Sequence, residues 1–326
     1  MASGRGYILG DFIAPHDTAG RIVLGEGPSW IGIGAQRCGT TWFTDLLVQH
    51  PEFDVPQGRK EHHWLYLYGL VREWDETARD GFRDLFDGDG KKLGEWTPYY
   101  LRASWVCELA AEVLPDDAPI LVMFRDPIDR FASALRHEMT VAARMRRKSQ
   151  KASQKSPLRG RGRDWRDTQA GAAVRRALRR SDLGRAGVDK IRSRKREATK
   201  GLPDSYWDRP TIRYVGSDLS WGGMYAAQMD AWTATFPEDR FIVLQYEKVR
   251  RDPQLYADLV WERLGLKPVR IKDVDRPSIA STKGKLWRAD DYPHVVRALK
   301  RIYRPDAERL ADRFDIDLKL WTRTMS

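Results

Sequence analysis

The residues with the clearest chemical meaning lie in a short glycine-containing stretch near the N-terminus. Residues 34–41 read GAQRCGTT, so four residues separate two glycines and the hydroxyl side chains of Thr40 and Thr41 follow. This spacing is typical of a phosphate-binding loop, except that Thr40 stands where nucleotide triphosphatases have a lysine. Because that lysine reaches the β and γ phosphates, its loss disfavours γ-phosphoryl chemistry. Arg37 supplies a cation within the loop, and with the N–H groups of residues 38–42 it predicts a site for an α-position phosphate.

A second pair of candidate residues follows an apolar run. Residues 120–124 read ILVMF, which is typical of a strand buried on both faces, and Arg125 comes directly after it. Ser133 lies two turns into the helix predicted next. Residues at the carboxyl ends of parallel strands face the ligand crevice, so Arg125 and Ser133 can converge on one phosphate. An ion pair of Arg125 with Asp126 or Asp129 is the alternative use of this guanidinium.

Three strand–helix units are expected to position these residues. Apolar runs predict the strands, and apolar side chains at helical spacing predict the helices. The predicted units are strand 29–34 with helix 40–50, strand 120–124 with a helix over 128–139, and strand 241–245 between helices 223–236 and 254–264. This alternation predicts an α/β fold with a P-loop-type parallel sheet, flanked by helices on both faces, as a single domain over residues 1–326.

A basic segment interrupts these units. Residues 139–200 hold 21 Lys and Arg against 5 Asp and Glu, a net charge of +16, which leaves −5 for the rest of a chain whose total is +11. We therefore predict a basic insertion over residues 139–217 within the domain. Its stretch 148–163 has almost no apolar residues and is expected to be disordered alone, whereas residues 167–183 have the pattern of a small basic helix.

The insertion has several possible partners. It can act as a lid that recruits an anionic acceptor, such as a sulfated or carboxylated glycan. It can bind nucleic acid through phosphates, although Trp165 is the only aromatic residue in its basic part, residues 139–200. It can also lie on anionic lipid, or be a solvated loop with no dedicated partner. We favour the lid.

Composition excludes several classes of protein. With 41% hydrophobic and 11% aromatic residues the chain can bury a core, which excludes global disorder. Its two cysteines, Cys38 and Cys107, are too few for a disulfide scaffold or a four-cysteine zinc site, and the six histidines lack paired ligand spacing, so no metal is expected. No apolar segment resembles a signal peptide or a membrane span, so we expect a cytoplasmic protein.

Five motifs in order resemble the sulfotransferases that use 3′-phosphoadenosine 5′-phosphosulfate (PAPS). The likeness is nearest to the bacterial and heparan sulfate 3-O-sulfotransferase branch and spans about residues 30–285. The motifs are RCGTT at 37–41, KEHHW at 60–64, GEWTPYYL at 94–101, RDPIDRFAS at 125–133 and STKGK at 281–285. The resemblance implies transfer of a sulfuryl group from PAPS to a hydroxyl or amine of a small-molecule or glycan acceptor, by in-line displacement and without a metal.

The resemblance also assigns roles to residues. Glu61 is implied to be the general base, with Lys60, Arg37 and His63 as the other catalytic groups. The implied nucleotide-binding residues are Arg37, Cys38, Gly39, Thr40, Thr41, Trp42, Arg125, Ser133, Lys283, Gly284 and Lys285. The implied acceptor-binding residues are Lys60, His63, Trp64, Thr97 and Tyr99. Tyr246 and Glu247 match a structural pair of the family.

Some positions depart from the family pattern and leave alternatives open. Trp64 and Leu65 replace an aromatic pair, and Trp96 replaces a lysine, so the acceptor need not be heparan sulfate. His63 is the runner-up base, because an unperturbed imidazole, with a pKa of about 6.5, suits proton transfer at neutral pH better than a glutamate with a pKa of about 4.3.

Two other functions compete with sulfuryl transfer. A P-loop kinase of a small molecule has the same fold, and Asp126 after its strand could mimic a magnesium-binding residue. A basic nucleic-acid-binding protein with a degenerate P-loop would explain the insertion.

Overall fold

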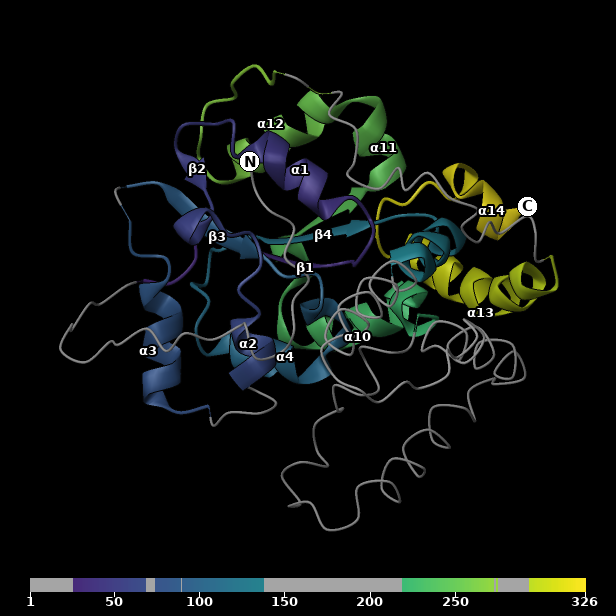
Figure 1. The fold of residues 1–326 in the computed structure, drawn as a ribbon, viewed down its shortest axis with the longest axis horizontal. Coiled ribbons are helices and arrows are strands. Elements are labelled where there is room, and N and C mark those ends of the chain that lie inside the picture. The colour runs from purple at the N-terminus through teal and green to yellow at the C-terminus, as the bar shows by residue number, and fades with distance from the viewer. Residues whose placement is uncertain (1–25, 69–73, 89, 138–218, 273, 275–292) are drawn as a thin grey trace, which may run out of the picture.

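Five parallel strands form one sheet in the computed structural model, in the order β2-β3-β1-β4-β5 (Figure 1). The structure describes residues 26–68, 74–88, 90–137, 219–272, 274 and 293–326. The strands are β1 (Trp30–Gly34), β2 (Phe53–Asp54), β3 (Lys92–Trp96), β4 (Ile120–Phe124) and β5 (Phe241–Gln245). All three predicted strands are therefore present, and the predicted parallel sheet is confirmed.

The central strand β4 shows why the apolar run forms a buried strand. Every residue of β4 is fully buried, with β1 on one side and β5 on the other. Its register with β5 runs from Ile120 opposite Phe241 to Phe124 opposite Gln245. Strand β3 was not predicted, because Lys92 and Glu95 interrupt its apolar pattern although it lies directly beside β1.

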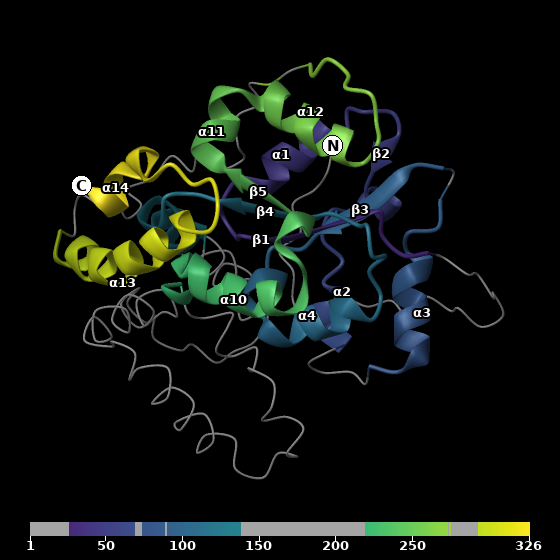
Figure 2. The same ribbon diagram turned by 180° about the vertical axis from the view of Figure 1, so that it is seen from behind.

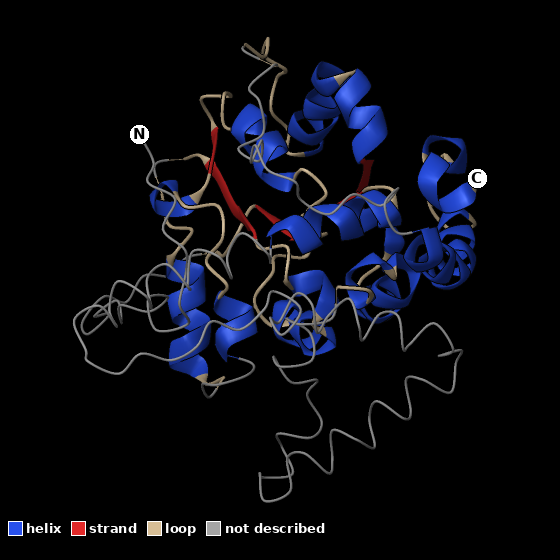
Figure 3. Ribbon diagram, turned by 45° about the vertical axis from the view of Figure 1, so that its right-hand side comes forward, coloured by secondary structure: helices blue, strands red, loops and turns tan. Residues whose placement is uncertain are grey.

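Helices cover both faces of the sheet. Figures 1 and 2 show α1, α11 and α12 on one face and α2, α4 and α10 on the other, and Figure 3 shows the strands enclosed between these layers. The α-helices are α1 (Thr40–Leu47), α2 (Trp64–Tyr68), α3 (Glu76–Asp84), α4 (Ser104–Ala111), a helix described over 127–137, α10 (Tyr225–Thr235), α11 (Tyr246–Arg251), α12 (Pro253–Arg263), α13 (Pro293–Ala311) and α14 (Thr322–Met325). Single 3₁₀ turns lie at Pro56–Gly58, Tyr100–Arg102, Trp221–Gly223, Glu238–Arg240 and Leu318–Leu320.

The predicted helices are present, and two of them have different bounds. Helix α1 ends at Leu47 rather than at residue 50, because a turn closed by the bond from the N–H of His50 to the carbonyl of Leu47 follows it. Residue 224 separates the turn Trp221–Gly223 from α10, so the predicted helix 223–236 is in two parts.

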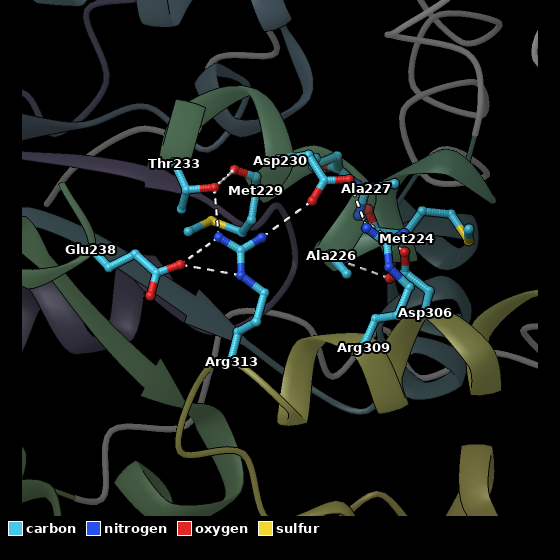
Figure 4. Close-up of polar contacts among 11 residues, drawn as sticks. Met224, Ala226, Ala227, Met229, Asp230, Thr233, Glu238, Asp306, Arg309 and Arg313 are labelled. Atoms are coloured by element: carbon cyan, nitrogen blue, oxygen red, sulfur yellow. Dashed lines mark hydrogen bonds and ion pairs between the residues drawn. The ribbon is translucent and has the colours of Figure 1, made fainter. Parts of the chain in front are cut away.

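The C-terminal helix α13 packs on α10 through polar contacts (Figure 4). Arg313 binds Glu238 and Asp230, and the buried Asp306 accepts hydrogen bonds from the N–H groups of Ala226 and Ala227 at the start of α10, both at 3.0 Å. Burial raises the pKa of Asp306 to about 6, although the two N–H groups oppose this shift. The exposed ion pairs contribute little to stability, so we attribute the docking mainly to Asp306 and to buried apolar side chains.

Several expectations concern residues outside the described ranges. These are the insertion 139–217, its stretches 148–163 and 167–183, and residues 283–285. None of the described helices is long and apolar enough to cross a membrane.

Candidate active site

The glycine-containing loop leaves the carboxyl end of β1 and leads into α1. Gly39 immediately precedes the helix with a φ of 95°, and a Cβ atom there would lie 2.6 Å from the ring of Tyr246. A residue other than glycine is therefore disfavoured here both by the positive φ and by the contact with the Tyr246 ring. No side chain caps the N-terminus of α1. Its positive end is available to an anion, as expected for a phosphate-binding loop.

Lys60 joins this loop to the predicted base. Its Nζ atom lies 3.0 Å from Oγ1 of Thr40, 3.5 Å from Oγ1 of Thr41 and 2.9 Å from Oε1 of Glu61. The Lys60 side chain is 12% exposed. Burial lowers its pKa and the charge of Glu61 opposes that shift. The structure thus places the Lys60 amine between the threonine hydroxyl groups at the start of α1 and the carboxylate of Glu61.

Glu61 lies between Lys60 and His63. Its second oxygen, Oε2, is 3.3 Å from Nε2 of His63. Burial raises the pKa of Glu61, but Lys60 and His63 outweigh burial and hold that pKa at about 2. Glu61 is therefore ionised at neutral pH and can accept a proton from a neighbouring group.

A buried carboxylate on β3 holds the loop that carries Glu61. Glu95 accepts hydrogen bonds from the N–H of His62 at 2.8 Å, the hydroxyl of Thr97 at 2.7 Å and the hydroxyl of Tyr100 at 2.5 Å. The Thr97 hydroxyl in turn accepts a bond from the N–H of His63 at 3.2 Å. Glu95 and Thr97 are both fully buried. The backbone on the C-terminal side of Glu61 is thereby tied to the central sheet.

We expect Glu95→Gln to damage this support. An amide group supplies one acceptor oxygen and turns an NH₂ donor toward groups that themselves donate. Leaving buried donors unsatisfied costs about 1–3 kcal/mol each, so the free energy of unfolding and kcat should both fall. Chemical denaturation and turnover measurements check this result, with Glu52→Gln at an exposed position as the matched control. An unchanged kcat in the Glu95 variant would contradict a role in holding the loop.

Arg37 is bonded to Ser133, which lies in the helix that follows Arg125. Arg37 Nε donates to the Ser133 hydroxyl at 3.2 Å, so this arginine points to the helix over 127–137 rather than to Lys60. Burial lowers the pKa of Arg37, and the positive charge of Arg125 lowers it further. The Arg125 guanidinium lies 4.8 Å from the centre of the Tyr246 ring. Arg37 and the Ser133 hydroxyl thus form a cation–hydroxyl pair of the kind that binds phosphate.

The alternative ion pair of Arg125 is not observed. Within the described ranges, no ion pair joins Arg125 to Asp126 or to Asp129, and Asp129 binds Arg323 at 3.0 Å instead. Asp126 is 2% exposed and both of its carboxylate oxygens already accept hydrogen bonds, which disfavours it as the magnesium ligand that the kinase hypothesis needs. The described ranges contain no group of three or more His, Cys, Asp or Glu able to hold a metal ion.

The predicted acceptor residues are only partly gathered. The His63 ring lies 5.7 Å from the Tyr99 ring, and the Tyr99 hydroxyl accepts a bond of 2.7 Å from Gln36 in the glycine-containing loop. Lys60, His63 and Tyr99 therefore share one region. Trp64 is not part of it, because its indole N–H donates to the Ala78 carbonyl in α3 at 3.0 Å.

Two further predicted residues have structural roles. Thr97 is fully buried and its hydroxyl is used within the protein. Cys38 is buried, its N–H donates to the Ala35 carbonyl at 3.2 Å, and burial raises the pKa of its thiol to about 11. Trp96, at the position of the family's lysine, lies in the core and donates to the Gly34 carbonyl at 3.0 Å. Because the N–H of Cys38 is already bonded to Ala35, the loop N–H groups available to an anion begin after Cys38.

Sequence reasoning missed three residues of this region. Glu95 and Gln36 carry no separate signal, although each lies within a motif. Tyr225 also escaped notice, and its hydroxyl donates to the Arg125 carbonyl at 2.9 Å and lies 3.4 Å from the Cys38 sulfur. Because strand β3 was not predicted, the burial of Glu95 could not be inferred from the sequence.

Comparisons with known proteins identify a matching domain family and several similar solved structures. The profile of the sulfotransferase domain matches residues 28–287. A sulfotransferase from Alicyclobacillus acidocaldarius is similar in structure, with a TM-score of 0.56 and 22% identity over 90% of this chain and 98% of that chain. The sulfotransferase domain of the Synechococcus PCC 7002 olefin synthase has a TM-score of 0.39 and 13% identity over 90% of this chain and 96% of its own. The sulfotransferase domain of the curacin biosynthetic pathway has a TM-score of 0.40 and 12% identity over 89% of this chain and 98% of its own. No curated protein matches the sequence.

Proposed function

The chain belongs to the sulfotransferase domain family, and we propose that it transfers a sulfuryl group from PAPS to a hydroxyl or amine of a small-molecule or glycan acceptor. The observation that carries this proposal is the position of Lys60, whose Nζ atom lies within 3.5 Å of both loop threonines and 2.9 Å from Glu61. A donor anion at the start of α1 and an acceptor beside Glu61 would meet at this amine.

The described residues fit a doubly phosphorylated nucleotide. The uncapped N-terminus of α1 suits the 5′ end, where Thr40 and Thr41 add hydroxyl groups. Arg125 and Ser133 suit the 3′-phosphate, which ATP lacks. Arg37 contacts Ser133 and can bind either phosphate from there. The roles of Lys283, Gly284 and Lys285 stay a prediction of the resemblance.

The chemistry needs one base and one cation. The donor supplies a sulfuryl group joined to a phosphate through an oxygen that leaves with it. Glu61 takes the proton of the acceptor hydroxyl or amine as the acceptor atom bonds to sulfur. Lys60 stabilises the negative charge that grows on the bridging oxygen as its bond to sulfur breaks.

The position of Lys60 also regulates the strength of the base. Lys60 is bonded to Glu61 and, together with His63, holds the pKa of Glu61 at about 2, so the carboxylate is a weak base. A donor anion that draws the Lys60 amine away from Glu61 leaves only His63 to oppose the effect of burial on the pKa of Glu61. The proton affinity of the carboxylate then rises as the reacting groups meet. His63, bonded to the same carboxylate, is the alternative base.

Calorimetry tests the nucleotide preference. We expect adenosine 3′,5′-bisphosphate to bind more tightly than ADP, because only the former has a 3′-phosphate. Arg125→Ala should weaken binding of the bisphosphate by about 10- to 150-fold, which corresponds to the loss of a hydrogen bond to a charged group, and Ser133→Ala should weaken it less. Neither variant should change the affinity for ADP by as much.

A screen of acceptors with labelled PAPS follows the calorimetry. Magnesium-dependent ATP turnover without any response to PAPS would refute the proposal and support the kinase. Salt-sensitive binding to DNA or RNA that disappears when residues 139–200 are deleted, together with no nucleotide binding, would support the nucleic-acid alternative.

A further inference from the structure

The C-terminal end of the chain is bonded directly to the turn that presents Arg125. The Asp126 carboxylate accepts hydrogen bonds from the N–H of Arg323 at 2.9 Å, the N–H of Thr324 at 3.1 Å and the hydroxyl of Thr324 at 2.7 Å. Figures 1 and 2 show α14 beyond the carboxyl end of β4, on the same side as the start of the helix that follows. Residues 321–326 are therefore part of the structure around Arg125, although nearly 200 residues separate them in sequence.

A second bridge runs parallel to the first. Glu247, at the start of α11, accepts a bond of 2.9 Å from the N–H of Asp126 and a bond of 3.1 Å from the indole N–H of Trp321. Trp321 and Thr324 are fully buried. The C-terminal segment thus contacts Asp126 at its side chain through Thr324 and at its backbone through Glu247.

The same carboxylate organises the helix that carries Ser133. Oδ1 of Asp126 also accepts bonds from the N–H groups of Ile128 at 2.9 Å and of Asp129 at 3.3 Å, which caps the start of this helix. Arg125 precedes Asp126, and its own carbonyl accepts the bond from Tyr225. The peptide bond between Arg125 and Asp126 is therefore fixed by bonds to Tyr225 and Glu247, and the Asp126 carboxylate is fixed in part by Thr324.

We propose that Thr324 and Trp321 are positioning residues of the 3′-phosphate subsite. They orient Arg125 and Ser133 through Asp126 and Glu247, without contacting the nucleotide. This inference rests on the proposed function, and it extends the nucleotide site to a segment that lies beyond the family match at residues 28–287. The start of α1 and Lys60 are not part of these bridges, so the segment should affect the 3′-phosphate and not the 5′-phosphate.

The test compares two nucleotides that differ only at the 3′ position. Isothermal calorimetry with adenosine 3′,5′-bisphosphate and with adenosine 5′-monophosphate gives a ratio of affinities for each variant. Thr324→Val keeps the shape of the side chain and removes the hydroxyl. We expect the bisphosphate affinity to fall by about tenfold, as for the loss of one buried hydrogen bond, while the monophosphate affinity stays within about twofold. Thr324→Ser should restore the ratio, because it restores the hydroxyl.

The control is Thr322→Val, which makes the same chemical change at an exposed position of α14 and should leave both affinities unchanged. Trp321→Phe removes the bond to Glu247 but keeps a buried ring, so it is a second variant if Thr324→Val does not fold. An unchanged ratio in the folded variants, whatever their melting temperatures, would mean that the segment is only structural and would overturn the inference. A wild-type protein with equal affinity for the two nucleotides would instead refute the proposed function, and the inference with it.

Discussion

Glu61→Gln is expected to lower kcat by about 10²- to 10⁴-fold, the usual contribution of a general base, while nucleotide affinity stays nearly unchanged. Glutamine keeps the size of the side chain and can still accept one hydrogen bond from Lys60. It cannot take a proton at neutral pH. The contacts of Glu61 are to Lys60 and His63, not to Arg125 or Ser133, so the 3′-phosphate subsite should be preserved. The measurements are single-turnover transfer with labelled PAPS and calorimetry with adenosine 3′,5′-bisphosphate.

The His63→Gln variant distinguishes the two possible bases. If Glu61 is the base, His63→Gln should reduce kcat less than Glu61→Gln does, because His63 only orients the carboxylate from 3.3 Å. If Glu61→Gln retains full activity at saturating acceptor, the base must be reassigned, and His63 is the next candidate. A loss of nucleotide binding in Glu61→Gln would mean that the carboxylate has a structural role instead.

The sequence predicted the parts of the fold with local signals. The apolar run at β4, the glycine-containing loop and the apolar spacing of α1 each depend on neighbouring residues, and all three lie where they were expected. The order of strands was not predictable in this way. Strand β3 places Glu95 beside Ile31 of β1, and only this pairing brings Glu95 close to His62. A contact between residues 33 positions apart in sequence requires the complete sheet.

Residue roles were hardest to predict where a motif mixes core and surface positions. Thr97 and Trp96 belong to the motif that resembles the acceptor side of the family, but both are fully buried. Trp64 also contacts α3 instead of the site. Lys60, Glu61 and His63 were chosen from the order of the motifs, since a charged pair alone is more often a solvated surface pair. The C-terminal bridge to Asp126 had no sequence signal, because threonine and tryptophan have no distinctive spacing there.

Lys60→Met should give the other large loss of activity, about 10²- to 10³-fold in kcat, as when a group that stabilises developing charge is removed. Methionine has a similar length and no charge. The growing charge on the bridging oxygen then lacks a nearby amine, while Arg125 and Ser133 remain to bind the 3′-phosphate. Calorimetry should therefore show a much smaller change in nucleotide affinity than kinetics shows in kcat.

The same substitution should change the pH profile of the residual activity. Burial raises the pKa of Glu61, and Lys60 is the largest influence that lowers it, so removing Lys60 moves this pKa upward from about 2. A group that must be ionised loses activity as the pH falls through its pKa, so kcat/KM of the variant should begin to fall at a higher pH than in the wild type. Lys60→Arg, which keeps the charge, should retain the wild-type acid limb, and Lys91→Met, at an exposed ion pair with Asp54, should change neither property. An acid limb that does not move in Lys60→Met would show that the essential base is not a carboxylate under the control of Lys60, which excludes Glu61 in the role proposed for it.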